Sequence, residues 1–140
     1  MIHQHQHTLN IPCHGRGFYP LTHEVSHWLQ QTDIRTGMLN LFVQHTSCSL
    51  IIQENADPDV LRDMEMFMAR LVVDGDAAFR HRDEGDDDMS AHIRMALTQV
   101  SLSIPLLNGQ LALGTWQGLY LYEHRTHPMQ RRILLHLMGE

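Results

Sequence analysis

The sequence predicts an α+β fold, in which a largely antiparallel sheet packs against a few helices in a single compact domain, residues 1–140. Several short runs of alternating or apolar residues are typical of strands, and fewer runs have helical spacing. The links between predicted strands are short, which favours antiparallel pairing, and Asn108-Gly109 is a strong hairpin signal. No repeat or linker divides the chain, which is 43% hydrophobic and long enough to bury one core.

The N-terminal part of the chain predicts one strand and one short helix. Residues 2–11 alternate in character, but neither face is cleanly apolar, so we expect an edge strand. Thr22 can cap the helix that follows, in which Val25, Trp28 and Leu29 share one face.

The next segment contains two predicted strands and the clearest helix start. Residues 38–44 are mostly apolar, as in a central strand, and residues 48–53 form a second extended run. Asp57 fits an N-cap, Pro58 the first helical position, and Asp59 the positive end of the helix dipole. Apolar residues then recur at helical spacing: Val60, Leu61, Met64, Phe67, Met68 and Leu71. We expect this stripe to lie in the core; a Met-rich interaction surface is the alternative.

The last part of the chain predicts one further helix and four strands. The helical stripe comprises Met89, Ile93, Ala96, Leu97 and Val100. Strands are expected over residues 101–107, 110–115, 118–124 and 131–138, and the first two form the hairpin.

An acidic loop, residues 83–88, is the most informative segment for function. Five of its six residues are acidic, and His81 and His92 stand on either side. The formal net charge is −6, and this loop accounts for nearly all of it. Neighbouring carboxylates raise one another's pKa, so solvation, helix dipoles or a bound cation must offset the crowding. The segment is therefore either a solvated loop or a site.

Three histidines are candidate metal ligands. His45 follows an apolar strand, His81 precedes the acidic loop, and His92 lies near a helix start, where the dipole favours a neutral imidazole. Three neutral imidazoles plus water would form an open catalytic metal site. Hydrogen-bonded structural histidines are the alternative, because the spacing matches no local zinc motif.

Carboxylates of the loop are candidates for the chemistry itself. Glu84, Asp87 and Asp88 could bind a magnesium-bound diphosphate or act as a general base. Asp88 and His92 are four residues apart, so they share a face if the helix has begun. Helix capping and solvation are the alternative roles.

Two polar segments near the C-terminus complete the candidates. Trp116 and Gln117 lie between two glycines, an arrangement that suggests a bulge where Trp116 could stack on a ring. Arg125 could bind a phosphate, with a strand-end salt bridge as the alternative. We expect Arg131 and Arg132 to be surface charges.

Several classes of function are disfavoured. The chain has no lysine, which excludes a P-loop or a Schiff-base lysine. It has no evident basic patch, so no nucleic-acid partner is expected. It has neither an apolar run of membrane-spanning length nor a signal peptide, and Cys13 and Cys48 read as buried reduced thiols, so we expect a cytoplasmic protein without a membrane partner.

The histidines at positions 3, 5 and 7 would lie on one face of the first strand. Such an array can bind metal, but a solvated strand face is the simpler interpretation. We leave His3, His5 and His7 outside the predicted site.

In chain order, these motifs together resemble the YjbQ-like family, whose members are described as secondary thiamine-phosphate synthases. The matching residues are Arg16-Gly17-Phe18, His45-Thr46-Ser47, Glu54-Asn55, Asp57-Pro58, His81, Glu84-Gly85, Asp87-Asp88-Met89, Ala91-His92-Ile93, Gly114-Thr115-Trp116-Gln117-Gly118 and Glu123-His124-Arg125.

The resemblance implies a homotrimer with a pocket at the subunit boundary that takes a small phosphorylated metabolite. The implied reaction joins hydroxymethylpyrimidine diphosphate to thiazole phosphate and releases diphosphate, assisted by a divalent metal ion, Mg²⁺ for this reaction or else Zn²⁺ or Mn²⁺. The expected catalytic residues are His45, Glu84, Asp87, Asp88 and His92. The expected substrate-binding residues are Ser47, Asn55, Trp116, Gln117 and Arg125, and the expected metal ligands are His45, His81 and His92. A metal-dependent phosphohydrolase and a non-catalytic metal- or ligand-binding trimer remain alternatives.

Overall fold

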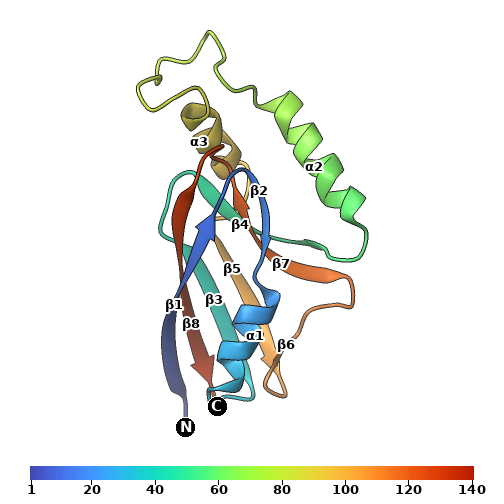
Figure 1. Cartoon of the computed structure of the whole chain (residues 1–140). Coiled ribbons are helices and arrows are strands. Elements are labelled where there is room, and N and C mark those ends of the chain that lie inside the picture. The colour runs from blue at the N-terminus through green and yellow to red at the C-terminus, as the bar shows by residue number, and fades with distance from the viewer.

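The computed structural model describes all residues from 1 to 140 and contains two antiparallel sheets and three helices (Figure 1). The five-stranded sheet has the order β1 (His3–Cys13), β8 (Met129–Gly139), β3 (Gly37–Val43), β5 (Ser101–Leu107) and β6 (Gln110–Leu111). The three-stranded sheet has the order β2 (Gly17–Pro20), β7 (Gln117–Glu123) and β4 (Cys48–Glu54). The helices are α1 (Thr22–Gln30), α2 (Pro58–Leu71) and α3 (Asp88–Ala96). The predicted α+β class is confirmed, and β1 is an edge strand as expected.

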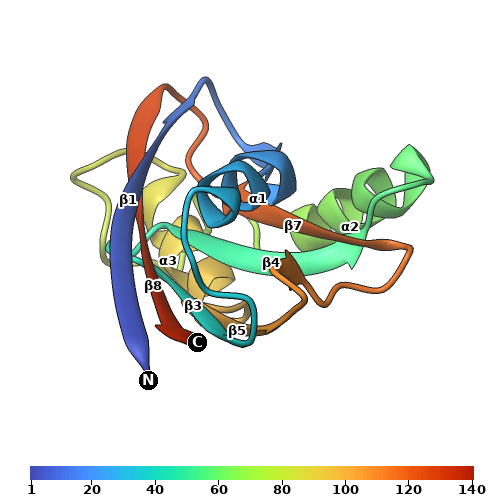
Figure 2. The same ribbon diagram turned by 90° about the horizontal axis from the view of Figure 1, so that it is seen from below.

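The core lies between the two sheets and under α1 (Figure 2). Alternation along the strands supplies it: in β8, Ile133, Leu135 and Leu137 are all fully buried. In β7, all residues after Gln117 are buried, because this central strand of the smaller sheet is covered on both faces. None of the helices has the combination of length and apolar character that crossing a membrane requires.

The predicted hairpin is present between β5 and β6. Asn108 and Gly109 have φ angles of 52° and 78°, the two positive values that a type I′ turn requires. The second strand is shorter than expected, because only Gln110 and Leu111 pair with β5. Residues 112–116 form a loop, in which the Gly114 N–H donates to Oε1 of Gln117 at 2.8 Å in place of the expected bulge.

The prediction that the α2 stripe lies in the core is wrong. The helix begins as expected, with the Asp57 carboxylate accepting from the Asp59 N–H at 2.9 Å, but no residue of α2 is buried and Phe67 is 61% exposed. Figure 1 shows α2 standing away from the sheets. Its inward contacts are partly polar, since Glu65 pairs with Arg94 at 2.8 Å. Helical periodicity identifies an apolar face but not what covers it.

Two other helix details differ from expectation. Thr22 is the first helical residue rather than the cap, and its hydroxyl accepts from the Leu119 N–H of β7 at 2.8 Å. The buried side of α3 is largely polar and includes Asp88 and Arg94, whereas Leu97, just beyond its end, is 58% exposed. Charge pairing with neighbouring segments, rather than apolar spacing, therefore orients α3.

Replacing Gly139 by Ala should lower the free energy of unfolding by about 2–3 kcal/mol, because overpacking forces the backbone apart. Gly139 ends β8 opposite Gly37 of β3, and an added Cβ would meet the Thr36 carbonyl oxygen and the Gly37 Cα. Urea unfolding measures the loss. Met138→Ala is the control, since Met138 is 43% exposed and should change stability less. Equal losses in the two variants would contradict the close backbone contact.

Candidate functional site

The acidic loop lies in the last part of the connection from α2 to α3, at the end of the molecule opposite both chain termini (Figure 1). Three potential ligand atoms gather there: His81 Nε2, Asp88 Oδ2 and His92 Nε2 all lie within 4.8 Å of one another. Asp88 Oδ2 is 2.5 Å from His81 Nε2 and 3.1 Å from His92 Nε2. We refer to these three residues as the His–Asp cluster. It is the only group of three such side chains that meets this distance in the chain.

The hydrogen-bond partner of His92 Nδ1 shows which nitrogen of the ring carries the proton. His92 Nδ1 lies 2.7 Å from the Thr46 carbonyl oxygen, which can only accept, so Nδ1 carries the hydrogen. In the neutral ring, Nε2 then points a lone pair at the Asp88 carboxylate. Two acceptors face each other stably only if a proton or a cation lies between them. An N–H to carbonyl bond of this kind is also how metal-binding histidines are commonly oriented.

Charge at the cluster favours the ionised carboxylate. Burial of Asp88, which is 2% exposed, raises its pKa, but the hydrogen bond from His81 and the charge of Arg125 outweigh this and lower it. The same hydrogen bond to Asp88 raises the pKa of His81. Asp88 is therefore ionised at neutral pH, and a metal ion at the cluster would displace the proton that His81 shares with it.

Arg125 holds the acidic loop in place. Its Nε donates to Asp87 Oδ2 at 3.0 Å, Nη1 pairs with Asp88 Oδ1 at 2.7 Å, and Nη2 donates to the Glu84 carbonyl oxygen at 2.9 Å. All three nitrogens of the guanidinium are thus engaged with the loop. This arrangement favours a positioning role for Arg125 over the direct phosphate contact that we expected, and it corresponds to the salt-bridge alternative.

Asp87 completes the attachment of the loop. Its Oδ2 also accepts from the Thr126 N–H at 2.8 Å and from the Thr126 hydroxyl at 3.1 Å. Burial raises the pKa of Asp87, but the hydrogen bonds from Arg125 and Thr126 prevail and lower it to about 2. Asp87 is therefore a structural anion rather than a proton acceptor. The Glu84 residue, by contrast, is exposed at the rim of the loop.

A buried ion pair lies next to Arg125, whose backbone N–H donates to the Glu123 carboxylate. Arg131 Nε donates to Glu123 Oε2 at 2.5 Å, and Nη2 donates to the Ser47 hydroxyl at 2.9 Å. Arg131 is 2% exposed and Glu123 is fully buried. The expectation that Arg131 is a surface charge is wrong, because it lies on the inner face of β8 together with Ile133. Ser47 contacts this pair.

His124 is a buried neutral histidine beside the same network. Its Nε2 is 2.9 Å from the Ser49 hydroxyl, and its Nδ1 has no hydrogen-bond partner. Burial lowers the pKa of His124 to about 3, and the nearby charges of Arg94, Arg16 and Arg131 act in the same direction.

Stability should therefore fall as the pH drops from about 6.5 towards 3. In that range the unfolded chain protonates His124 and the folded chain does not, a cost of about 1.4 kcal/mol per pH unit. Urea unfolding at several pH values between 6 and 4.5 measures the slope. A His124→Asn variant, which has no group to titrate, should have a shallower slope than the parent chain. Equal slopes would contradict a neutral buried His124.

His45 lies apart from the His–Asp cluster. Its Nε2 accepts from the backbone N–H of Arg132 at 2.8 Å, so that lone pair is already used. Burial lowers the pKa of His45, and the charges of Arg131 and Arg132 add to this effect. The structure thus groups His81 and His92 with Asp88 rather than with His45.

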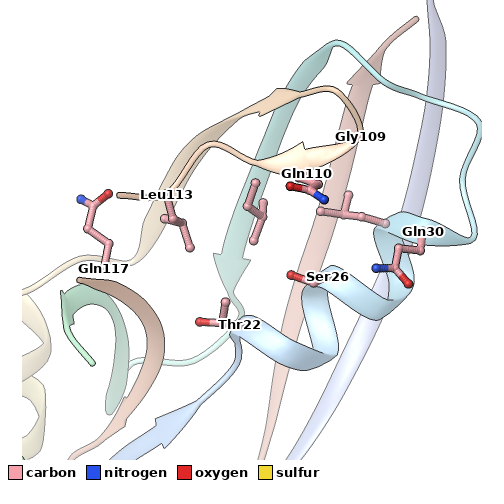
Figure 3. A pocket seen from close by; sticks show the side chains of 9 residues that line it. Thr22, Ser26, Gln30, Gly109, Gln110, Leu113 and Gln117 are labelled. Carbon is pink, nitrogen blue, oxygen red and sulfur yellow. The ribbon is translucent and has the colours of Figure 1, made fainter. Parts of the chain in front are cut away.

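Three expected substrate-binding residues lie far from the cluster in one chain. Asn55, Trp116 and Gln117 meet where β4 and β7 pair at the end opposite Glu123, and the Asn55 N–H donates to the Trp116 carbonyl oxygen at 3.0 Å. The length of β7 separates them from the cluster by about 20 Å. Trp116 is 63% exposed. Gln117 lines a groove of about 280 Å³ between α1 and the β5–β6 hairpin, a groove that carries no titratable side chain (Figure 3).

Some residues of the site had no signal in the sequence. Asp74 accepts two hydrogen bonds from Arg16, at 2.9 Å and 3.0 Å, and a third from Ser90, which joins three distant segments under the loop. Thr126 fixes Asp87 in the same way. Every fixed positive charge in the chain is an Arg, whose planar fork suits buried carboxylates, but this composition does not point to Asp74 or Thr126.

Comparison with known proteins identifies the chain. The family described as "UPF0047 protein YjbQ-like" matches residues 7–140. The chain belongs to the UPF0047 family. This UPF0047 chain is 50% identical to a UPF0047 protein of Synechocystis sp. over 98% of its own length and 93% of that protein. It is 42% identical to the YjbQ protein of Escherichia coli O157:H7, covering 97% of this chain and 99% of that one.

Solved structures agree with the UPF0047 fold. A conserved hypothetical protein from Thermus thermophilus is 35% identical, with a TM-score of 0.81 over 92% of this chain and 97% of that one. A YbjQ-like protein of unknown function from Sulfolobus solfataricus P2 has a TM-score of 0.85 over 99% of this chain and 100% of that one. At 20% identity, the second similarity concerns the fold alone.

Proposed function

We propose that this UPF0047 chain is a divalent-metal-dependent enzyme that acts on a small phosphorylated metabolite, with His81, Asp88 and His92 as the metal ligands. One observation carries the proposal: His92 Nε2, without a proton of its own when the ring is neutral, faces a buried carboxylate oxygen that His81 also approaches. A cation between these atoms would remove the repulsion and be bound by His81 Nε2, Asp88 Oδ2 and His92 Nε2.

The donor set fits some metals better than others. Two imidazoles and one carboxylate suit Zn²⁺ or Mn²⁺, whereas Mg²⁺ prefers oxygen ligands and retains several waters. Such an ion, when bound, would polarise a phosphoryl oxygen or lower the pKa of a coordinated water. Arg125 keeps Asp88 oriented, and the exposed Glu84 is available at the rim to accept a proton.

Among reactions of this class, the first candidate is the joining of hydroxymethylpyrimidine diphosphate to thiazole phosphate, the reaction implied by the resemblance. A cation at the cluster would neutralise the leaving diphosphate. The second candidate is hydrolysis of a phosphate ester, which is favoured by the donor set, since it suits Zn²⁺ or Mn²⁺ better than Mg²⁺. Both use the same ligands.

We further propose that the active form is a cytoplasmic homotrimer. The separation of Trp116 and Asn55 from the His–Asp cluster supports this, because a neighbouring subunit could supply them to the pocket. The exposed apolar side chains of α2, such as Phe67, give an assembly surface to cover. Light scattering should then give about three times the 16.2 kDa chain mass. The buried thiols Cys13 and Cys48 fit a reducing compartment.

The test of the proposed function is an assay on purified protein with Mg²⁺, Mn²⁺ or Zn²⁺. Thiamine phosphate is measured after adding hydroxymethylpyrimidine diphosphate and thiazole phosphate. Phosphate release is measured with simple phosphate esters. Turnover in the parent chain that His92→Gln removes and His136→Gln retains would support the metal enzyme. His136 is the control, because it contacts Gln4 and Gln6 on the outer face of the large sheet. Absence of both products with every metal, or equal turnover in the His92 variant, would refute it.

A further inference from the structure

Helix α1 carries a second group of side chains that can bind a metal ion, far from the acidic loop. Its sequence includes His23, Glu24 and His27 in the order His-Glu-Val-Ser-His. Residues four apart on a helix lie on the same face, with Cβ atoms about 5–6 Å apart. In zinc enzymes this spacing supplies two imidazole ligands, with the intervening glutamate beside the metal.

The exposed side chains of His23, Glu24 and His27 line one groove. The groove has a volume of about 430 Å³, lies between α1 and β1, and is lined by His7, His23, Glu24 and His27 among others. Thr22, Ser26 and Gln30 line a different groove, on the other flank of α1 (Figure 3). The side chains of α1 that can bind a metal ion therefore lie on the side of the helix that faces β1.

Strand β1 brings a third imidazole to this groove. The His7 ring stacks on the Trp28 indole of α1, with centroids 5.5 Å apart and planes 13° apart. His7, His23 and Glu24 make no hydrogen bond or ion pair within the chain, so their polar atoms are free to bind. The Gln31 amide nitrogen lies 3.2 Å from His27 Nε2, so a metal ion would bind His27 through Nδ1 or displace this exposed contact. Metal binding requires the unprotonated imidazole.

The other histidines of β1 are committed elsewhere. His5 Nε2 is 2.9 Å from Asp33 Oδ1, and His3 Nδ1 is 3.6 Å from Asp33 Oδ2. The side chains of His3, His5 and His7 thus divide, because the first two turn to Asp33 and the third to α1. This division provides matched control positions on the same strand.

We propose that His7, His23 and His27 form a second metal site, which takes an imidazole-preferring divalent ion such as Zn²⁺ and joins the edge strand β1 to α1. The ring nitrogens of these residues are farther apart than those of the His–Asp cluster, so rotation of exposed side chains brings them to the ion. Glu24 stands beside the site as a further oxygen donor or an acceptor for a proton of bound water. Mg²⁺ and Ca²⁺, which prefer oxygen ligands, should not bind here. The site is independent of the function proposed above.

The experiment uses untagged protein in which His81→Gln and His92→Gln remove the other cluster. Calorimetric titration with Zn²⁺ should give one ion per chain, and Zn²⁺ should raise the melting temperature, because the ion binds the folded state. Adding His23→Gln or His27→Gln should weaken binding at least tenfold and abolish the thermal shift. Adding His7→Gln should weaken Zn²⁺ binding by a smaller factor, and adding His3→Gln should leave the Zn²⁺ affinity unchanged.

Three results would overturn the proposal: no Zn²⁺ binding in this background, an affinity unaffected by the His23 and His27 substitutions, or a loss of binding in the His3→Gln control instead. The substituted histidines of α1 are exposed, so each variant should retain the melting temperature of the background in the absence of metal. Because the background lacks the His–Asp cluster, failure here leaves the proposed function untouched, and failure of that function leaves this site untouched.

Discussion

Replacing Asp88 by Asn is expected to weaken metal binding at the His–Asp cluster by at least about a hundredfold and to reduce turnover to a similar extent. Asn has the same shape, so Arg125 can still donate to its amide oxygen at the position of Oδ1, where the pair now measures 2.7 Å. What is lost is the negative charge and the oxygen that both His81 and His92 approach. The buried site then offers two imidazoles without a carboxylate.

Calorimetric titration of Zn²⁺ and Mn²⁺ into the parent chain and the Asp88→Asn variant measures this effect. Asp83→Asn is the matched control, because Asp83 belongs to the same acidic loop, is exposed, and makes no hydrogen bond or ion pair. Its removal should change affinity by less than about threefold, as expected for a screened surface charge. Similar losses in the two variants would mean that the loop attracts cations only through its overall charge.

Replacing Glu123 by Gln is expected to lower the free energy of unfolding by about 3–5 kcal/mol, because it leaves the Arg131 charge buried without its partner. The pair has no access to solvent that could compensate, since Glu123 is fully buried and Arg131 is 2% exposed. The Ser47 hydroxyl contributes only a neutral acceptor to the guanidinium. Because Ser47 precedes β4 and Arg131 lies in β8, the loss of the ion pair would also loosen the contact between these two segments.

Urea unfolding measures this change, and the double variant Glu123→Leu with Arg131→Met tests its cause. Removing both charges should restore most of the stability, because an apolar pair carries no desolvation cost. The exposed pair Asp59–Arg62 on α2, with nitrogen and oxygen 3.1 Å apart, is the control, and Asp59→Asn should cost less than about 1 kcal/mol. A loss of that small size for Glu123→Gln would contradict the buried charge pair.

Local patterns predicted most of the fold. The strands other than β2, the Asn108-Gly109 turn and the start of α2 at Asp57 depend on residues close in sequence, so the sequence contains their causes. The four-residue strand β2 was not predicted. The position of α2 depends on what covers it, which helical spacing does not encode. Arg131 did carry a signal: it alternates with Ile133 and Leu135, and this register places it on the inner face of β8.

The site was predictable only in part. Asp88 and His92 lie four residues apart on a helix that begins at Asp88, so their proximity follows from helical geometry. His81 joins them through the folding of the acidic loop around Arg125, which depends on contacts between segments distant in sequence. For the same reason the bond between His45 and the Arg132 backbone could not be predicted. Residue types indicated candidate ligands, and tertiary contacts decided which of them lie together.

The most direct test of the central claim is a crystal structure of Zn²⁺-loaded protein with anomalous diffraction recorded at the zinc edge. A zinc ion at the His–Asp cluster should give an anomalous peak about 2.0–2.2 Å from His81 Nε2, His92 Nε2 and one oxygen of Asp88. An empty His–Asp cluster at saturating Zn²⁺, with no anomalous peak between these three side chains, would contradict the claim, whatever metal is found elsewhere on the chain.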